Sequence, residues 1–259
     1  MTIRWKRALK TTVIVLLALA LLFAASFIPT LALKTGGMQV LEGQWVTVYY
    51  EKQEAAARDV FELAEAEAGR LTQKLGFSQK QDLAMYIYDR QSTFQTKKYG
   101  MIALLLNLNW YIGDNRGSTV LLASPGEAKS QNEYDRRKYA GPHEMVHALN
   151  SILNAKMPLW LNEGTALYLT NGAPPADLFD ASPVPALSQL DTSSPVAFSN
   201  MGGYHFAHTY MEFLDKTYGW DTVLALLKTG DYEGATGKTK QALYEAWLAF
   251  LKANYSAKT

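Results

Sequence analysis

Two histidines with three residues between them place the strongest constraint on this chain. His143 and His147 enclose Glu144 in the segment His-Glu-Met-Val-His. On an α-helix, residues four positions apart lie on the same face, so both imidazoles can direct a nitrogen at one point about 2.0–2.1 Å from each, the distance that zinc requires. The segment therefore predicts a helix with a zinc-binding face. The alternative is an amphipathic helix whose histidines face a polar cleft without a metal.

A third ligand is expected from Glu163, in the later segment Leu-Asn-Glu-Gly. We expect Glu163 to project from a second helix and to complete a set of three protein ligands with His143 and His147. Three protein ligands and one open position are typical of a catalytic zinc site rather than a structural one. Glu144 is expected to lie beside the two histidines, where its carboxylate can accept a proton from a water molecule without ligating the metal.

These two segments resemble the motifs of the gluzincin zinc metallopeptidases, and more narrowly of the peptidase MA-like branch that is related to the zinc aminopeptidases and thermolysin. A third similar segment begins at Gly203 and Tyr204 and ends at Tyr218-Gly219. The resemblance implies zinc-dependent hydrolysis of peptide bonds, with Glu144 as the general base. It also implies that the hydroxyl of Tyr204 donates a hydrogen bond to the tetrahedral intermediate.

The resemblance covers about residues 141–227 and departs from the aminopeptidases in two places. The interval between His147 and Glu163 is shorter, and the chain has no Gly-x-Met-Glu-Asn segment to hold the amino terminus of a substrate. The expectation is therefore an endopeptidase that acts on a peptide or protein. The alternative, from another class, is an exported zinc-binding or peptide-binding module without catalysis. An intact Glu144 favours the enzyme, because a purely structural site needs no base.

Residues 1–33 have the pattern of a targeting segment. Four basic residues and no acidic ones precede an uncharged stretch at 11–33, which is long enough to cross a bilayer. The pattern predicts a cleaved signal peptide or an uncleaved signal anchor, with the amino terminus cytoplasmic and the rest of the chain across the membrane. A buried core helix is the alternative. We expect an extracytoplasmic protein that is secreted or that contacts the membrane through this segment.

Charge and cysteine content exclude several other classes. After residue 33 the chain carries 21 basic and 24 acidic residues, a mildly acidic balance that argues against nucleic acid as a partner. The chain has no cysteine, which excludes disulfide bonds and thiolate metal sites.

Hydrophobic patterning predicts an α+β fold for residues 38–259. A small mixed or antiparallel sheet at 38–130 is expected to precede a mainly helical part at 131–259, with the active-site cleft between them. Strands are expected at 40–50, 82–88 and 118–124, and helices at 54–75 and 91–99. By resemblance, the strand at 118–124 would be the sheet edge that pairs with the substrate, an ordinary interior strand being the alternative.

The second part is predicted to contain the metal site on helices. Pro142 suits the first turn of a helix, so the metal-binding helix is expected from 142 to 154. A loop at 171–198 is expected to border the cleft, followed by helices at 204–218, 221–229 and 239–254. His205 and His208 could bind a second metal, but a solvated or hydrogen-bonded role is favoured. His208 and Tyr210 are the alternatives to Tyr204 as donor to the oxyanion.

Overall fold

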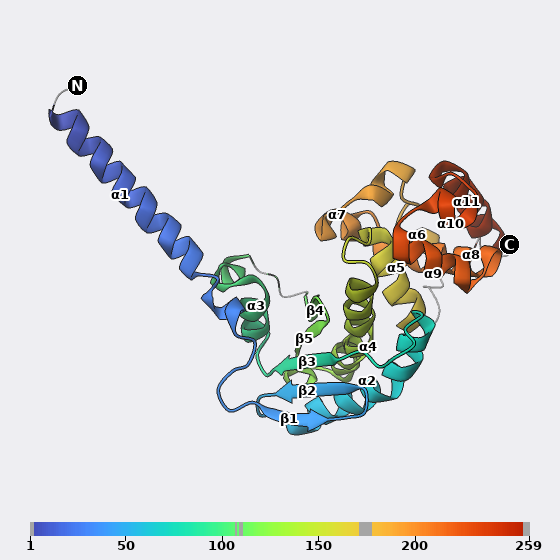
Figure 1. The fold of residues 1–259 in the computed structure, drawn as a ribbon, viewed down its shortest axis with the longest axis horizontal. Helices are drawn as coiled ribbons and strands as arrows, with labels where there is room; N and C mark the ends of the chain where they lie inside the picture. The colour runs from blue at the N-terminus through green and yellow to red at the C-terminus, as the bar shows by residue number, and fades with distance from the viewer. Residues whose placement is uncertain (1–2, 107, 109–110, 171–177, 256–259) are drawn as a thin grey trace.

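A computed structural model describes residues 3–106, 108, 111–170 and 178–255 (Figure 1). Its sheet has five strands in the order β1-β2-β3-β5-β4. The three inner strands run parallel, and each outer strand is antiparallel to its neighbour. The prediction of an α+β fold with a small mixed sheet is therefore confirmed. The strands are β1 (Gln39–Glu42), β2 (Val46–Tyr50), β3 (Leu83–Tyr88), β4 (Gly113–Arg116) and β5 (Thr119–Ala123).

Helices make up most of the remaining described residues. In the first half they are α1 (Ile3–Ala25), η1 (Ile28–Leu31), α2 (Glu54–Lys74), α3 (Gln91–Tyr99), η2 (Met101–Leu105) and η3 (Pro125–Glu127). In the second half they are α4 (Gln131–Leu153), α5 (Leu159–Thr170), α6 (Leu178–Ala181), η4 (Leu187–Asp191), α7 (Pro195–Asn200), α8 (Gly203–Tyr218), α9 (Trp220–Thr229), α10 (Tyr232–Thr236) and α11 (Lys240–Tyr255).

Two strand predictions need correction. The single strand expected at 40–50 is an antiparallel pair, because the chain turns between β1 and β2, where the Glu65 carboxylate accepts from the backbone N–H groups of Trp45 and Val46 at 3.0 Å. The strand expected to be the sheet edge, β5, is an interior strand hydrogen-bonded to β3 on one side and β4 on the other. The edge beside it is β4, which the sequence pattern did not predict.

The metal-binding helix begins eleven residues earlier than predicted, at Gln131 instead of Pro142. Ser130 starts it, because its hydroxyl accepts from the backbone N–H of Glu133 at 3.2 Å, a common helix cap. Pro142 lies inside α4, where proline normally disrupts a helix. Gly141 precedes it and has no Cβ to clash with the proline ring. A Cβ at Gly141 would also lie 3.1 Å from Val60 of α2, so the same glycine lets α2 and α4 pack closely.

The loop predicted at 171–198 is wrong in its described part. Residues 171–177 lie outside the described residues, and from Leu178 onward the chain forms the short helices α6, η4 and α7. The helices predicted at 204–218, 221–229 and 239–254 are confirmed within one or two residues as α8, α9 and α11.

One hydrophobic core joins the sheet to the helical part. It includes Val48 and Met85 of the sheet, Leu71 of α2, Leu149 of α4 and Trp160 of α5. Trp247 of α11 is fully buried against the ring of Trp160, with the ring centroids 5.8 Å apart. The site residues of α4 and α5 therefore rest on a rigid packed base.

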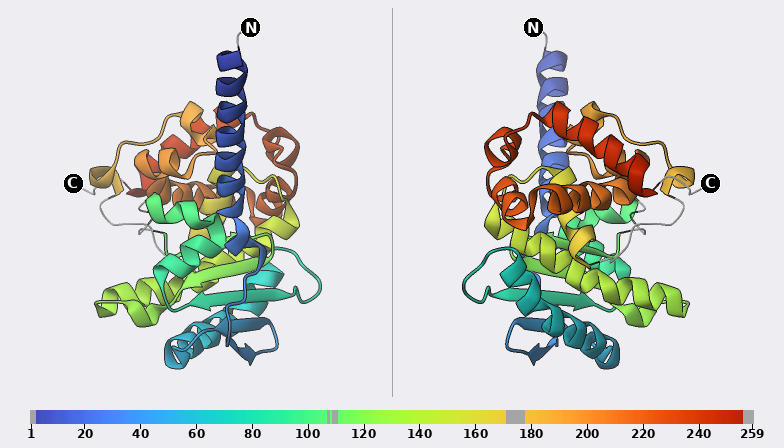
Figure 2. Two further views of the ribbon diagram at one scale, coloured as in Figure 1. Left: turned by 90° about the vertical axis from the view of Figure 1, so that its left-hand side faces the viewer. Right: turned by 90° about the vertical axis from the view of Figure 1, so that its right-hand side faces the viewer.

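Helix α1 stands apart from this core (Figures 1 and 2). The segment Leu9–Leu31 is long and apolar enough to cross a membrane, with a mean hydropathy of 2.6, and none of it is buried within the protein. The structure thus contains the apolar helix expected of a signal peptide or anchor, and its full exposure is contrary to a core helix.

Candidate metal centre

The three predicted ligands meet at one point. His143 Nε2 and His147 Nε2 lie 3.1 Å apart, and Glu163 Oε2 is 3.6 Å from the first and 3.5 Å from the second. Ligands about 2.0–2.1 Å from a tetrahedral zinc lie roughly 3.3 Å from one another, so the triangle has the size that zinc requires. Glu163 Oε2 is buried and accepts no hydrogen bond, which leaves it available to a cation.

Local sequence explains how α4 and α5 bring the ligands together. The two histidines are one helical turn apart on α4, and Glu163 lies in the first turns of α5. Asn150 of α4 donates to Asn162 of α5 at 2.9 Å, which fixes the two helices beside the ligands. A Cβ at Gly164 would lie 2.8 Å from the backbone oxygen of Ala207, so this glycine allows α8 to pack directly against α5.

Burial and mutual attraction shift the pKa values of the three ligand residues. Burial lowers the pKa of His143 and keeps its imidazole neutral. Burial also disfavours the charged form of His147, but the Glu163 carboxylate outweighs it and raises the pKa of His147 well above its usual range. The same pairing outweighs burial at Glu163 and holds its pKa well below the usual range. Metal binding at His147 would therefore have to displace a proton.

Glu144 lies next to the ligands and beneath the sheet edge. It is 8% exposed, and burial raises its pKa to about 8. A Cβ at Gly113 of β4 would lie 2.8 Å from Glu144 Cγ and 3.0 Å from Oε1. Glycine at this position therefore lets the edge strand pass directly over the carboxylate.

This contact predicts a specific effect of Gly113→Ala. The new methyl group would also lie 2.9 Å from Leu122 Cδ2, so it cannot be accommodated unless Glu144 or β4 moves. If the site catalyses the hydrolysis expected from the sequence, a displacement of about 1 Å would reduce the rate by roughly 10²-fold, while bound metal is retained. Metal analysis and peptide hydrolysis measure the two effects. Gly36→Ala is the control, since a Cβ there meets nothing within 4 Å; equal activity of the two variants would contradict this role of Gly113.

The structure also places Tyr204 in the neighbourhood of the site. Tyr204 lies in the first turn of α8, with its ring packed edge-on against Phe198 at 4.9 Å between centroids. Burial raises its pKa, and the nearby Glu163 and Glu144 raise it further, so its hydroxyl keeps the proton that a donor needs.

A second tyrosine, which the sequence did not single out, is subject to the same carboxylates. Burial raises the pKa of Tyr111 to about 12, with further contributions from Asp114, Glu163 and Glu144. The two other candidates for the oxyanion donor, Tyr210 and His208, pack against other aromatic rings. Tyr210 is 1% exposed among core aromatic rings, and His208 is 4% exposed with its ring 5.4 Å from that of Tyr168. Tyr111 therefore joins them as a further candidate beside Tyr204.

A polar cluster that the sequence did not predict holds the edge strand in place. Asp114 of β4 accepts from Lys98 Nζ at 2.6 Å and from the hydroxyl of Tyr99. Lys98 Nζ also donates to the backbone oxygen of Asn115. In the sequence, the adjacent Lys98 and Tyr99 at the end of a predicted helix could have indicated such a cluster. Their partner, Asp114, lies in a strand that the sequence did not predict.

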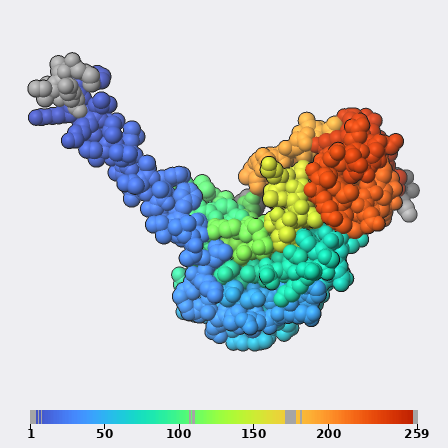
Figure 3. All heavy atoms as spheres, in the orientation of Figure 1, coloured from blue at the N-terminus to red at the C-terminus, as the bar shows by residue number. Residues whose placement is uncertain are grey.

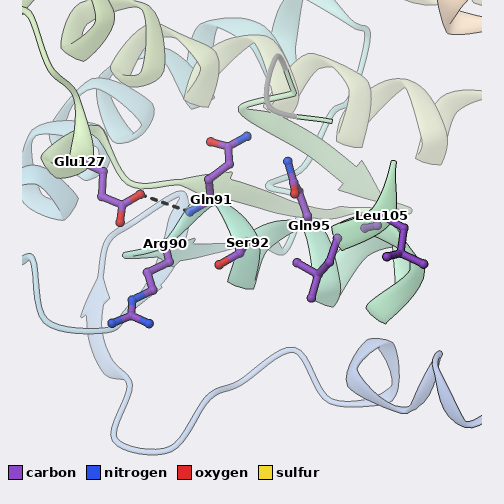
Figure 4. A pocket seen from close by; sticks show the side chains of 8 residues that line it. Arg90, Gln91, Ser92, Gln95, Leu105 and Glu127 are labelled. Carbon is purple, nitrogen blue, oxygen red and sulfur yellow. Dashed lines mark hydrogen bonds between the residues drawn. The ribbon is translucent and has the colours of Figure 1, made fainter. Parts of the chain in front are cut away.

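The remaining candidate positions lie apart from the metal ligands. Among the described residues, His205 and His208 belong to no cluster with metal-ligand spacing. A pocket of about 400 Å³ lies over α3 and η2, and none of the five predicted site residues lines it (Figure 4). Its lining includes Gln95 and Leu105, and the backbone N–H of Gln91 donates to Glu127 at 3.3 Å. The geometry of the metal ligands, and not this pocket, therefore marks the candidate site.

Comparisons with protein-family models, with curated proteins and with solved structures gave no significant match. The function of the site must therefore be inferred from the arrangement of its residues.

Proposed function

We propose that the protein is a zinc-dependent endopeptidase. One observation carries the proposal: two imidazole nitrogens and a carboxylate oxygen converge within metal-ligand distance, and the buried Glu144 lies beside them under a sheet edge. A structural zinc site usually has four protein ligands and needs no base next to it. The arrangement therefore fits metal-assisted hydrolysis better than metal storage.

Each residue has a defined task in the proposed reaction. Zinc, when bound by His143, His147 and Glu163, supplies a Lewis acid that polarises a carbonyl group and lowers the pKa of water. Glu144 accepts a proton from the attacking water and returns it to the leaving amine. The Tyr204 hydroxyl donates a hydrogen bond to the oxyanion as it forms.

The edge strand offers a way to hold an extended substrate. The backbone N–H of Ala123 in β5 donates to the backbone oxygen of Ile112 at 2.9 Å. Because antiparallel pairs alternate, the backbone groups of Gly113 in the next pair point away from β5. A peptide that pairs with Gly113 would lie next to Glu144. The role first expected of β5 is therefore proposed for β4.

Metal removal tests the proposal directly. We expect the wild-type protein to contain zinc, to cleave an unstructured protein such as casein, to lose the activity with a chelator and to regain it with added zinc. Two histidines and one carboxylate also suit non-haem iron, so elemental analysis is part of the test. Cleavage by metal-free protein would contradict the proposal. Bound zinc without cleavage of casein or a mixed peptide library would favour the non-catalytic binding module.

The role of Tyr204 predicts an effect on turnover rather than on binding. Tyr204→Phe removes one oxygen and leaves the contact with Phe198 intact. A hydrogen bond to an oxyanion strengthens only as the negative charge develops, so kcat should fall by roughly 10²–10³ while KM and zinc content change little. Steady-state kinetics on a defined peptide measures this. If Tyr111→Phe loses the activity and Tyr204→Phe keeps it, the donor is Tyr111.

The proposed location is outside the cytoplasm. Basic residues in the first turns of α1, ahead of its apolar stretch, favour a cytoplasmic amino terminus, and the rest of the chain, with the metal site, would then lie across the membrane. The substrate would be a peptide or protein in that compartment.

A further inference from the structure

The end of α1 is attached to the globular part by direct contacts rather than by a free linker. The backbone N–H of Met101 in η2 donates to the backbone oxygen of Ser26 at 2.7 Å. Gly100 permits this approach, because a Cβ there would also lie 2.7 Å from Ser26 O. Its φ of +82° is a further reason for glycine at this position. The segment η2 is therefore held beside the end of α1 (Figures 1 and 3).

Two basic side chains reinforce the attachment. Lys97 Nζ of α3 donates to the backbone oxygen of Ala32 at 2.5 Å. Arg116 Nη1, at the end of the edge strand β4, donates to the backbone oxygen of Thr30 in η1. These bonds satisfy carbonyl groups at the end of η1, and they connect the edge strand of the candidate site to the same segment.

The length of the apolar segment places η2 at the level of a membrane surface. The segment Leu9–Leu31 has 23 residues. About 20 helical residues cross the hydrocarbon core of about 30 Å, so Ser26 falls in the last turns of the span. Because the backbone of Met101 is hydrogen-bonded to that of Ser26, η2 must lie at the boundary between hydrocarbon and headgroups whenever α1 is in a bilayer.

The surface presented at this level is apolar. In η2 and just after it, the exposed side chains are Met101 (47%), Leu104 (47%), Leu105 (83%) and Leu106 (56%). In η1, Ile28 is 62% exposed and Leu31 is 83% exposed. Single exposed apolar side chains are common, but a group of six that extends from the end of an apolar span onto η2 indicates a contact surface. We call these six residues the juxtamembrane surface.

We propose that the juxtamembrane surface inserts into the outer part of the bilayer that holds α1. Its occupant is lipid, because the surface continues the apolar exterior of the span and lies at the depth where the acyl chains begin. The aliphatic stems of Lys97 and Arg116 fit the same boundary, where basic side chains extend along apolar surface toward water. The protein then has a second membrane contact beside α1, and β4 is oriented relative to the bilayer through Arg116. This inference does not depend on peptide hydrolysis.

The absence of cysteine makes the proposal testable with single labels. The full chain carrying Leu104→Cys is labelled with an environment-sensitive fluorophore and placed in phosphatidylcholine–phosphatidylglycerol nanodiscs. We expect the emission of the label to be blue-shifted. We also expect lipids that carry a nitroxide near the headgroup to quench it. Val40→Cys is the matched control, since Val40 on β1 is 45% exposed and Leu104 is 47% exposed; its label should remain water-like and unquenched.

Three results would overturn the proposal. Quenching at residue 104 no stronger than at Val40 would show that the surface stays in water. Blue-shifted emission without quenching by lipid would place the label against protein, in the pocket that Leu104 and Leu105 line, and not in the bilayer. A mature protein that mass spectrometry shows to lack α1 would remove the span on which the geometry depends. Leu105→Cys, at an 83% exposed position, provides the same measurement if Leu104→Cys does not fold, as judged by thermal unfolding.

Discussion

Replacing Glu144 by glutamine should abolish most peptide hydrolysis and leave the metal in place. Glutamine has nearly the same shape, so the contact with β4 at Gly113 is preserved, but an amide cannot accept the proton from the attacking water. A positioned general base contributes about 10²–10⁴-fold to the rate, and kcat should fall by at least this factor. Kinetics with a defined peptide and metal analysis of the same sample give the two quantities.

Two further variants make this result specific. Glu245→Gln is the same substitution at an exposed position of α11, and it should leave both activity and metal unchanged. Glu163→Gln removes a ligand and should weaken metal binding itself. If Glu144→Gln leaves kcat intact, or if it releases the metal as Glu163→Gln does, Glu144 is not the base.

The second large effect is expected for His147→Ala, which should remove the metal. Only two ligands then remain, and the Glu163 carboxylate loses its closest imidazole partner at 3.5 Å. Loss of an outer-shell partner already weakens metal sites by 10–100-fold, so loss of a ligand should weaken binding by more than about 100-fold. Elemental analysis after dialysis and competition with a zinc-sensitive dye measure this change.

His205→Ala is the matched control, because it removes a histidine that lies outside the ligand cluster. It should retain the metal, and it also tests whether His205 has any part in a second site. Circular dichroism must show that both variants are folded. Full metal content in folded His147→Ala would exclude the proposed ligand set.

The ligands could be predicted from the sequence because their geometry is local. Two histidines one turn apart must share a face of any helix that contains them, whatever the rest of the fold. Glu163 was also predicted from the sequence, but its meeting with the histidines depends on the close packing of α4, α5 and α8. The predicted start of α4 was wrong because Pro142, which suits a first helical turn, lies inside a helix that begins at the capping pair Ser130 and Glu133.

The edge strand could not be predicted in the same way. The residues of β4, Gly-Asp-Asn-Arg, have low strand propensity. Their extended conformation depends on pairing with β5 and on the bonds of Asp114 with Lys98 and Tyr99, which come from an earlier helix. The order of strands is likewise a property of the whole fold, so the pattern at 118–124 indicated a strand but not its neighbours.

The core that joins the sheet to the helical part gives the metal site an influence on parts of the protein that it does not touch. Helix α2, next to the sheet in sequence, is bound to the second half, since Lys74 O accepts from Trp220 Nε1 at 2.5 Å and Leu169 O accepts from Arg70 Nη2 at 2.9 Å. A ligand at 100 times its Kd stabilises a folded protein by about 2.7 kcal/mol. When such a protein unfolds as one unit, the bound metal stabilises every element in it by this free energy. A metal held between α4 and α5 would thus protect the distant strands β2 and β3 from unfolding as much as the helices that bind it.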